Sequence, residues 1–180
     1  MKTRDLIYCA LFAALTAIGA FLQIPTGTVP ITLQFLFTAL AGLLLGWKWG
    51  AISQLLYVGI GLLGLPVFTQ GGGIGYVLQP SFGFLLGLIP AAAVIGALTA
   101  RRTGYLTVLA AVLVGDLILY AVGVPYMYLI LHVYMQSAKT FPALLAAMLV
   151  YVPGDTLKIV VVTALVPVLR RTLAKAVPNL

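Results

Sequence analysis

The chain is a succession of long apolar runs, and short segments rich in glycine, proline or charge separate them. Hydrophobic residues make up 63% of the 180 positions and charged residues 7%, with a mean hydropathy of +1.17. A soluble domain cannot bury so much apolar surface, so the composition predicts an integral membrane protein. The runs predict an all-α fold with six transmembrane helices in a single membrane domain, residues 1–180. They fall at 5–22, 32–46, 50–64, 82–100, 105–123 and 152–170.

The second and third runs are short for a span of about 20 residues, so we expect their ends to extend into the loops. The first run follows Lys2 and Arg4, a pattern also found in signal peptides. It continues to Pro25 without a persuasive cleavage site, which favours a retained first helix. The stretch 124–152 predicts an extension of the fifth helix followed by a helix on the outer surface, with an added pair of spans as the alternative.

Basic residues predict the orientation in the membrane. With the N-terminus in the cytoplasm, most of the basic residues lie inside and only Lys139 lies outside between the spans, as the positive-inside rule requires. Those inside are Lys2, Arg4, Lys48, Arg101, Arg102, Arg170, Arg171 and Lys175. We therefore expect a multi-pass protein of the plasma membrane with both termini cytoplasmic. The net charge of +7 does not indicate nucleic-acid binding, because the basic residues are scattered at helix ends.

Catalytic and metal-binding patterns are missing from the sequence. No GxxxxGK[ST] loop for ATP is present, and three acids, one histidine and one cysteine leave little for catalysis. There is no HExxH, no nucleophile elbow and no set of residues with metal-ligand spacing. We expect no catalytic residue, no metal and no cofactor. If ATP energises transport, another subunit must supply the ATPase.

Two loops on the expected outer side carry most of the polar chemistry. One runs from Ile24 to Gln34 and the other from Phe68 to Phe82. The second contains Gly71, Gly72, Gly73 and Gly75, where backbone can approach a ligand closely or adopt positive φ. Neutral hydrogen-bonding groups and aromatic walls accompany them, a mixture that suits a small molecule. These are Thr32, Gln34, Gln70, Gln79 and Ser81, with Tyr76 and Phe82. The alternative is that the loops are only turns that cap helices.

An acid and a base, Asp155 and Lys158, lie three residues apart near the start of the last apolar run. Ionised groups at membrane depth persist mainly when they are paired or face a cavity, so the pair is a candidate ligand site. Pro153-Gly154 predicts that Asp155 lies in the first helical turn, partly as a cap, which leaves Lys158 as the better ligand candidate. A structural salt bridge is the alternative. Asp116 could pair with Lys158 or Lys139, or cap a kink.

Small residues form a stripe on the first helix. Ala10, Ala13, Ala14, Ala17 and Ala20 recur at spacings of three and four. Such stripes let another helix approach closely in lipid, where packing drives association. The stripe therefore predicts a helix contact, either with a partner or within the bundle.

Four segments in order give the chain a resemblance to the BioY family, the biotin-specific S components of energy-coupling factor (ECF) transporters. They are Val29-Pro-Ile-Thr-Leu-Gln34, Gly71-Gly-Gly-Ile-Gly-Tyr76, Pro80-Ser-Phe-Gly-Phe-Leu-Leu-Gly87 and Pro153-Gly-Asp-Thr-Leu-Lys158. The similarity runs over essentially the whole chain. Two departures from the family pattern are Gln79 before Pro80, and Ser81 where threonine is usual.

The resemblance implies the six-helix S-component fold and high-affinity biotin binding near the extracellular side. It also implies a transmembrane T component and two ABC-type ATPase subunits as partners, which alone use ATP. It implies that Ala10, Ala14 and Ala17 contact the T component and that Asp155 and Lys158 bind substrate.

Biotin chemistry agrees with the candidate residues. Its carboxylate needs a cation such as Lys158, and its ureido group needs Asp155, Gln79 or Gln34. Its ring needs apolar walls such as Tyr76 and Phe82, and Gly73 lies in the loop whose backbone can approach the ligand.

Other functions stay open at this point. The chain could bind another vitamin, such as riboflavin or thiamine. It could be an autonomous carrier in which Asp116 or Asp155 couples protons, and uptake in a host without the ATPases would support this. A small intramembrane enzyme that uses Asp155 and Lys158 as acid and base is a third possibility.

Overall fold

The computed structural model describes residues 3–26, 29–101 and 104–176, with side chains up to 169. Lys2, Arg102 and the side chains of Arg170, Arg171 and Lys175, used above for orientation, lie outside these described parts. The α-helices in chain order are α1 (Thr3–Phe21), α2 (Gln34–Leu62), α3 (Phe82–Leu98), α4 (Tyr105–Leu129), α5 (Phe141–Met148) and α6 (Val152–Ala176). Two short strands, β1 (Gln23–Ile24) and β2 (Ile31–Thr32), pair as an antiparallel hairpin between α1 and α2.

Helix α2 is two helices joined by a sharp bend at Gly46, whose φ of 79° and ψ of 179° are not helical. Two hydrogen bonds show that its arms run antiparallel. Thr38 Oγ1 donates to Gln54 Oε1 at 2.9 Å, and Gln34 Nε2 donates to the Tyr57 hydroxyl at 2.7 Å. The predicted runs 32–46 and 50–64 are therefore separate arms of one helical hairpin.

Polar side chains inside this hairpin are bonded to one another. Thr16 of α1 donates to the same Gln54 oxygen at 3.3 Å, and the Gln54 amide donates to Ser53 at 3.1 Å. These three residues and Thr38 are fully buried. In lipid a polar group has no water to bond, so such contacts between helices satisfy groups that would otherwise be costly.

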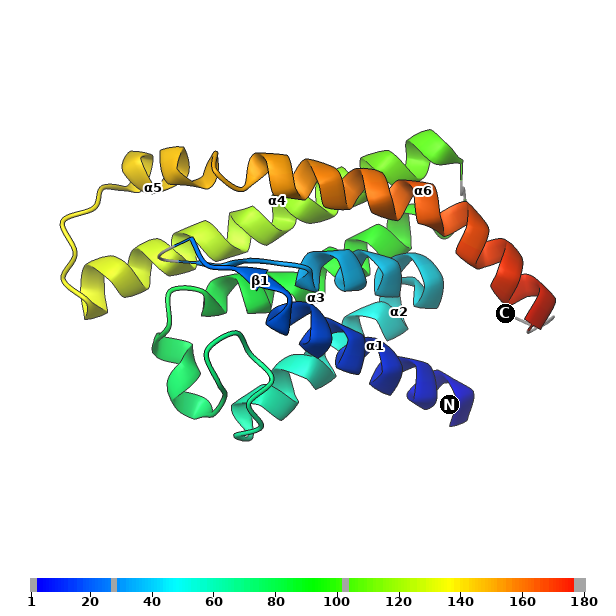
Figure 1. The fold of residues 1–180 in the computed structure, drawn as a ribbon, viewed down its shortest axis with the longest axis horizontal. Coiled ribbons are helices and arrows are strands. Elements are labelled where there is room, and N and C mark those ends of the chain that lie inside the picture. The colour runs from blue at the N-terminus through cyan, green and yellow to red at the C-terminus, as the bar shows by residue number, and fades with distance from the viewer. Residues whose placement is uncertain (1–2, 27–28, 102–103, 177–180) are drawn as a thin grey trace.

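The helices lie along the long axis of the molecule, as Figure 1 shows. The start of α1, the end of α6, the bend of α2 and the α3–α4 connection all lie at one end. The β hairpin, the loop between α2 and α3, and α5 lie at the other end, and α6 begins toward that end. Both termini are therefore on the same side of the bundle.

The stretch 124–152 contains the predicted helix extension and a separate helix after it, and the location of that helix on the outer surface stays a prediction. Helix α4 continues to Leu129 and passes into a π-helical turn, Ile130–Tyr134, and the short α5 follows. Eight residues cannot cross a hydrocarbon core that needs about 20, so α5 is not a span. The other predicted runs match α1, α3, α4 and α6 within a few residues, except at the extended C-terminal ends of α4 and α6.

By length and composition, four helices of the described residues can cross a membrane, and α3 is a shorter apolar helix. The four are Thr3–Phe21, Gln34–Leu62, Tyr105–Tyr134 and Val152–Leu169. The fold is thus a mostly helical membrane bundle.

Close packing at Gly42 generates a stability prediction. A Cβ there would lie 2.5 Å from the carbonyl oxygen of Ala92 on α3, and Gly50 of the second arm also packs against Gly42. We expect Gly42→Ala to lower the stability by about 1–3 kcal/mol, because backbone on both sides must shift. Thermal unfolding in detergent measures this. Gly59→Ala is the matched control, since nothing lies within 4 Å of its Cβ position. Equal melting temperatures for the two variants would contradict the tight packing.

Candidate functional site

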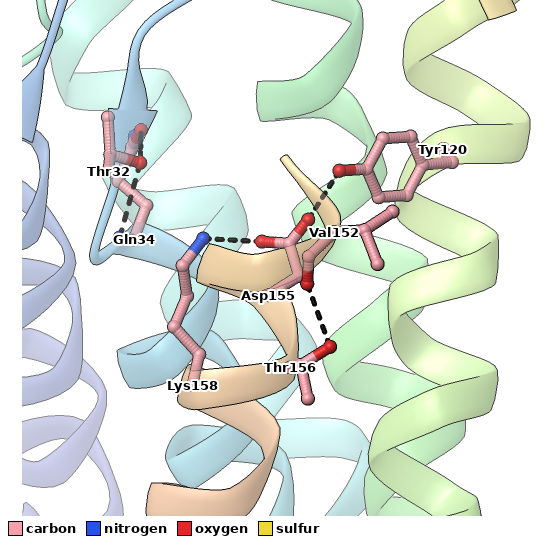
Figure 2. Close-up of polar contacts among 7 residues, drawn as sticks. All are labelled: Thr32, Gln34, Tyr120, Val152, Asp155, Thr156 and Lys158. Atoms are coloured by element: carbon pink, nitrogen blue, oxygen red, sulfur yellow. Dashed lines mark hydrogen bonds and ion pairs between the residues drawn. The ribbon is translucent and has the colours of Figure 1, made fainter. Parts of the chain in front are cut away.

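The centre of the candidate site is a buried ion pair on α6. The ammonium nitrogen of Lys158 lies 2.6 Å from Oδ1 of Asp155, as Figure 2 shows. Asp155 is 7% exposed and Lys158 is 8% exposed. At a spacing of three residues both side chains leave the same face of the helix.

The start of α6 places Asp155 where a carboxylate is favoured. As predicted, Asp155 lies in the first helical turn, and its backbone N–H donates to the carbonyl oxygen of Tyr151 at 2.9 Å. Backbone N–H groups near a helix N-terminus stabilise negative charge. The place of Asp155 in the first turn of α6 therefore favours its charged form.

A tyrosine of a different helix donates a second hydrogen bond to Asp155. The hydroxyl of Tyr120 on α4 donates a hydrogen bond to Oδ2 of Asp155 (Figure 2). Both carboxylate oxygens of Asp155 thus have a donor, which a buried charge requires. Tyr120 is not among the predicted site residues, although it follows Asp116 by four residues and so shares its face of α4.

This pair lines a cavity of about 70 Å³ between α2, α3, α4 and α6. Of the seven predicted substrate-binding residues, the structure brings four to its wall: Gln34, Tyr76, Asp155 and Lys158. Thr32 and Ser81 add hydroxyl groups, and Figure 2 shows Thr32 and Gln34 on the side of Lys158 away from Tyr120. Apolar side chains form most of the remaining wall, among them Phe35, Phe84, Leu85, Leu88 and Leu119.

Gln34 is held in place by a chain of hydrogen bonds. Its Nε2 donates to the Tyr57 hydroxyl at 2.7 Å, and that hydroxyl donates to the carbonyl oxygen of Val67 at 3.1 Å. Its Oε1 accepts from the Thr32 hydroxyl at 2.9 Å. The amide is therefore fixed between β2 and both arms of α2, and it presents an oriented polar group to the cavity.

Three other predicted site residues do not line this cavity. Phe82 is buried and packs edge-on against Tyr76, with 6.4 Å between ring centroids, so it supports the aromatic wall from behind. Gly73 adopts a φ of 100° and donates its N–H to the carbonyl oxygen of Gly61 at 2.7 Å. Gln79 is exposed and ends the 3₁₀ helix Ile74–Leu78. In the described geometry these residues shape the loop that carries Tyr76.

Asp116 lies on α4 one turn before Tyr120 and is half-buried. The structure pairs Lys158 with Asp155 instead of with Asp116. Within the described residues, Oδ1 of Asp116 is buried and has no hydrogen-bond partner. The described residues also contain no group of three or more His, Cys, Asp or Glu side chains that could hold a metal ion.

The alanine stripe of α1 divides between two faces. Ala13 and Ala20 are buried in the bundle, whereas Ala10 and Ala14 are exposed and Ala17 is half-buried. Large exposed residues such as Leu11 lie beside the exposed alanines on α1. Ala13 and Ala20 therefore make contacts within the bundle, and the contact of the exposed members with a partner stays a prediction.

Comparisons with known proteins find related sequences over most of the chain. The sequence model of the BioY family matches residues 1–175. The chain is 54% identical over 142 residues to a probable biotin transporter BioY of Lysinibacillus sphaericus, covering 78% of this chain and 72% of that protein. It is 40% identical over 186 residues to the biotin transporter BioY of Rhodobacter capsulatus, covering 98% and 96%.

A solved structure has the same fold. It is the crystal structure of the S-component for biotin from an ECF-type ABC transporter, with a TM-score of 0.83 and 31% sequence identity. The match covers 95% of each chain. The similarity thus extends over the helices, the outer loops and the segment that carries Asp155 and Lys158. The chain belongs to the BioY family.

Proposed function

We propose that this protein captures biotin at the extracellular face of the plasma membrane, as the substrate-binding subunit of an ECF-type uptake transporter. The observation that carries the proposal is the buried Asp155–Lys158 pair beside Gln34 and Tyr76, in a chain of the BioY family. The cavity combines a few oriented polar groups with apolar walls, which matches a ligand that has a ureido group, a carboxylate and an apolar ring.

The topology in the membrane is part of this proposal. The two arms of α2, together with α1, α3, α4 and α6, make six crossings, and an even number agrees with termini at the same end (Figure 1). That end also carries the start of α1 and the connection between α3 and α4, which contribute Arg4 and Arg101. By the positive-inside rule this end is cytoplasmic. The ion pair then lies in the extracellular half.

The first prediction concerns binding. We expect the purified protein to bind biotin and not riboflavin or thiamine. Lys158→Met and Asp155→Asn are expected to weaken binding at least about thirty-fold, because each leaves a buried polar partner unpaired. Equilibrium binding of radiolabelled biotin in detergent measures this.

The control for binding is Thr156→Ala, whose side chain is exposed and donates to the Val152 carbonyl oxygen on the same helix. It is expected to bind like wild type. The double variant Asp155→Asn/Lys158→Met removes both charges, so it separates loss of the site from loss of the fold. Unchanged biotin affinity in a folded double variant would refute the assigned site.

The second prediction concerns the orientation of biotin. We propose that Lys158 donates to the carboxylate, since one of its three N–H donors is used by Asp155. Asp155 and Gln34 then meet the ureido group. The uncharged biotin amide is expected to bind wild type at least about ten-fold more weakly than biotin, a charge-assisted bond being worth about 1.5–3 kcal/mol. In Lys158→Met this difference is expected to disappear.

Equal affinities of biotin and its amide for wild type would place the ureido group at the pair instead. The pair is neutral as a whole and offers one donor and one acceptor, which a ureido group can match.

The third prediction concerns the partners. We propose that a T component packs against Ala10, Ala14 and Ala17 and that two ABC ATPase subunits supply the energy. Ala14→Trp is expected to prevent copurification with the T component while biotin binding stays unchanged, because close helix approach in lipid needs small side chains. Ala110→Trp is the matched control, since Ala110 is an exposed alanine on α4. If Ala14→Trp still copurifies with the T component, this face of α1 does not form the interface.

A further inference from the structure

We infer that a second cavity, at the outer end beside α5, is an antechamber through which biotin reaches the buried site, and that Lys139 receives its carboxylate there. This inference rests on the proposed function. The cavity is distinct from the one at the ion pair, and Lys139 is not one of the predicted substrate-binding residues.

The outer cavity is larger than the inner one. Its volume is about 300 Å³, against about 70 Å³ for the cavity at Asp155 and Lys158. Sites for small organic ligands generally measure about 300–1,000 Å³. The outer cavity therefore has the size of a ligand-holding space, and the inner one must widen to admit biotin.

Two side chains separate the cavities, because Met148 and Tyr151 line both of them. Met148 is buried at the end of α5, and methionine has three rotatable bonds that let it change shape at low cost. The Tyr151 hydroxyl contacts Thr26 at 3.0 Å and donates to the carbonyl oxygen of Val29, so its ring is anchored. Movement of Met148 is the smaller change that would join the two spaces.

Charge favours an anionic ligand in the outer cavity. Lys139 lines it, is exposed, and forms no ion pair with any described residue. Apolar residues of α5, Ala143, Leu144 and Ala147, line the cavity as well. A cation at the mouth of an apolar cavity raises the local concentration of anions and their rate of entry. The carboxylate and the apolar ring of biotin fit this combination.

The experiment measures association and dissociation rates of radiolabelled biotin by rapid filtration on the full-length protein in detergent. Ala147→Leu partly fills the outer cavity. If biotin passes through it, both rates fall in the same proportion, by about ten-fold, and the equilibrium affinity stays the same. Ala146→Leu is the matched control, because Ala146 is an exposed neighbour on α5 that does not line the cavity. Ala143→Leu repeats the test from another wall position if Ala147→Leu does not fold.

Lys139→Gln tests the role of the charge. Its association rate at low ionic strength is expected to fall about three-fold while the dissociation rate stays unchanged, and added salt is expected to reduce the difference. Lys139→Arg should retain the wild-type rate.

Unchanged rates in the filled variants would overturn the antechamber, and an unchanged association rate in Lys139→Gln would overturn the role of Lys139. In the filled variants, a weaker affinity with an unchanged association rate would also overturn the path, since it places the substituted residue in the bound complex. Absence of biotin binding by wild type is a different result: it refutes the proposed function itself.

Discussion

The ion pair between Asp155 and Lys158 is the interaction on which the rest of the site depends. A charged pair inside an apolar bundle is tolerable only when each charge has a partner and the remaining lone pairs have donors. Here the acid bonds to Lys158 on its own helix and to Tyr120 on α4. This requirement fixes α6 against α4 in one register. The same register brings the pair to the cavity walls formed by α2 and α3.

Buried polar groups in α1 and the two arms of α2 must likewise find hydrogen-bond partners inside the bundle. The arms of α2 and the neighbouring α1 contain buried Thr and Gln side chains that bond across helices. At one end of this hairpin, Gln34 is tied to Tyr57 and to Thr32 of β2. The polar interior therefore serves two purposes, because it joins the helices and also orients an amide beside the ion pair. In the proposed function, the Gln34 amide thus contributes both to the packing of the hairpin and to ligand recognition.

The proposed route of biotin runs through the outer cavity, which is distinct from the cavity at Asp155 and Lys158. The ion pair and Tyr120 lie on the long helices α6 and α4, whereas the outer cavity is lined mainly by α5 and the segments next to it. Long packed helices hold polar groups at fixed distances, and short segments at the end of a bundle move more easily. A binding subunit needs both properties, since it must hold its ligand tightly and still exchange it.

The sequence by itself determined the membrane class, the positions of the helices and the local proximity of Asp155 to Lys158, because apolar runs and a spacing of three residues are local properties. It also predicted the extension of α4 and the separate helix that follows it. Only the tertiary structure decided that Gln34 and Tyr76 share a cavity with the pair, that Phe82 and Gln79 lie outside its wall, and that Tyr120 donates to Asp155. These are contacts between segments far apart in the chain, and their geometry depends on helix rotation and register, which no local pattern specifies.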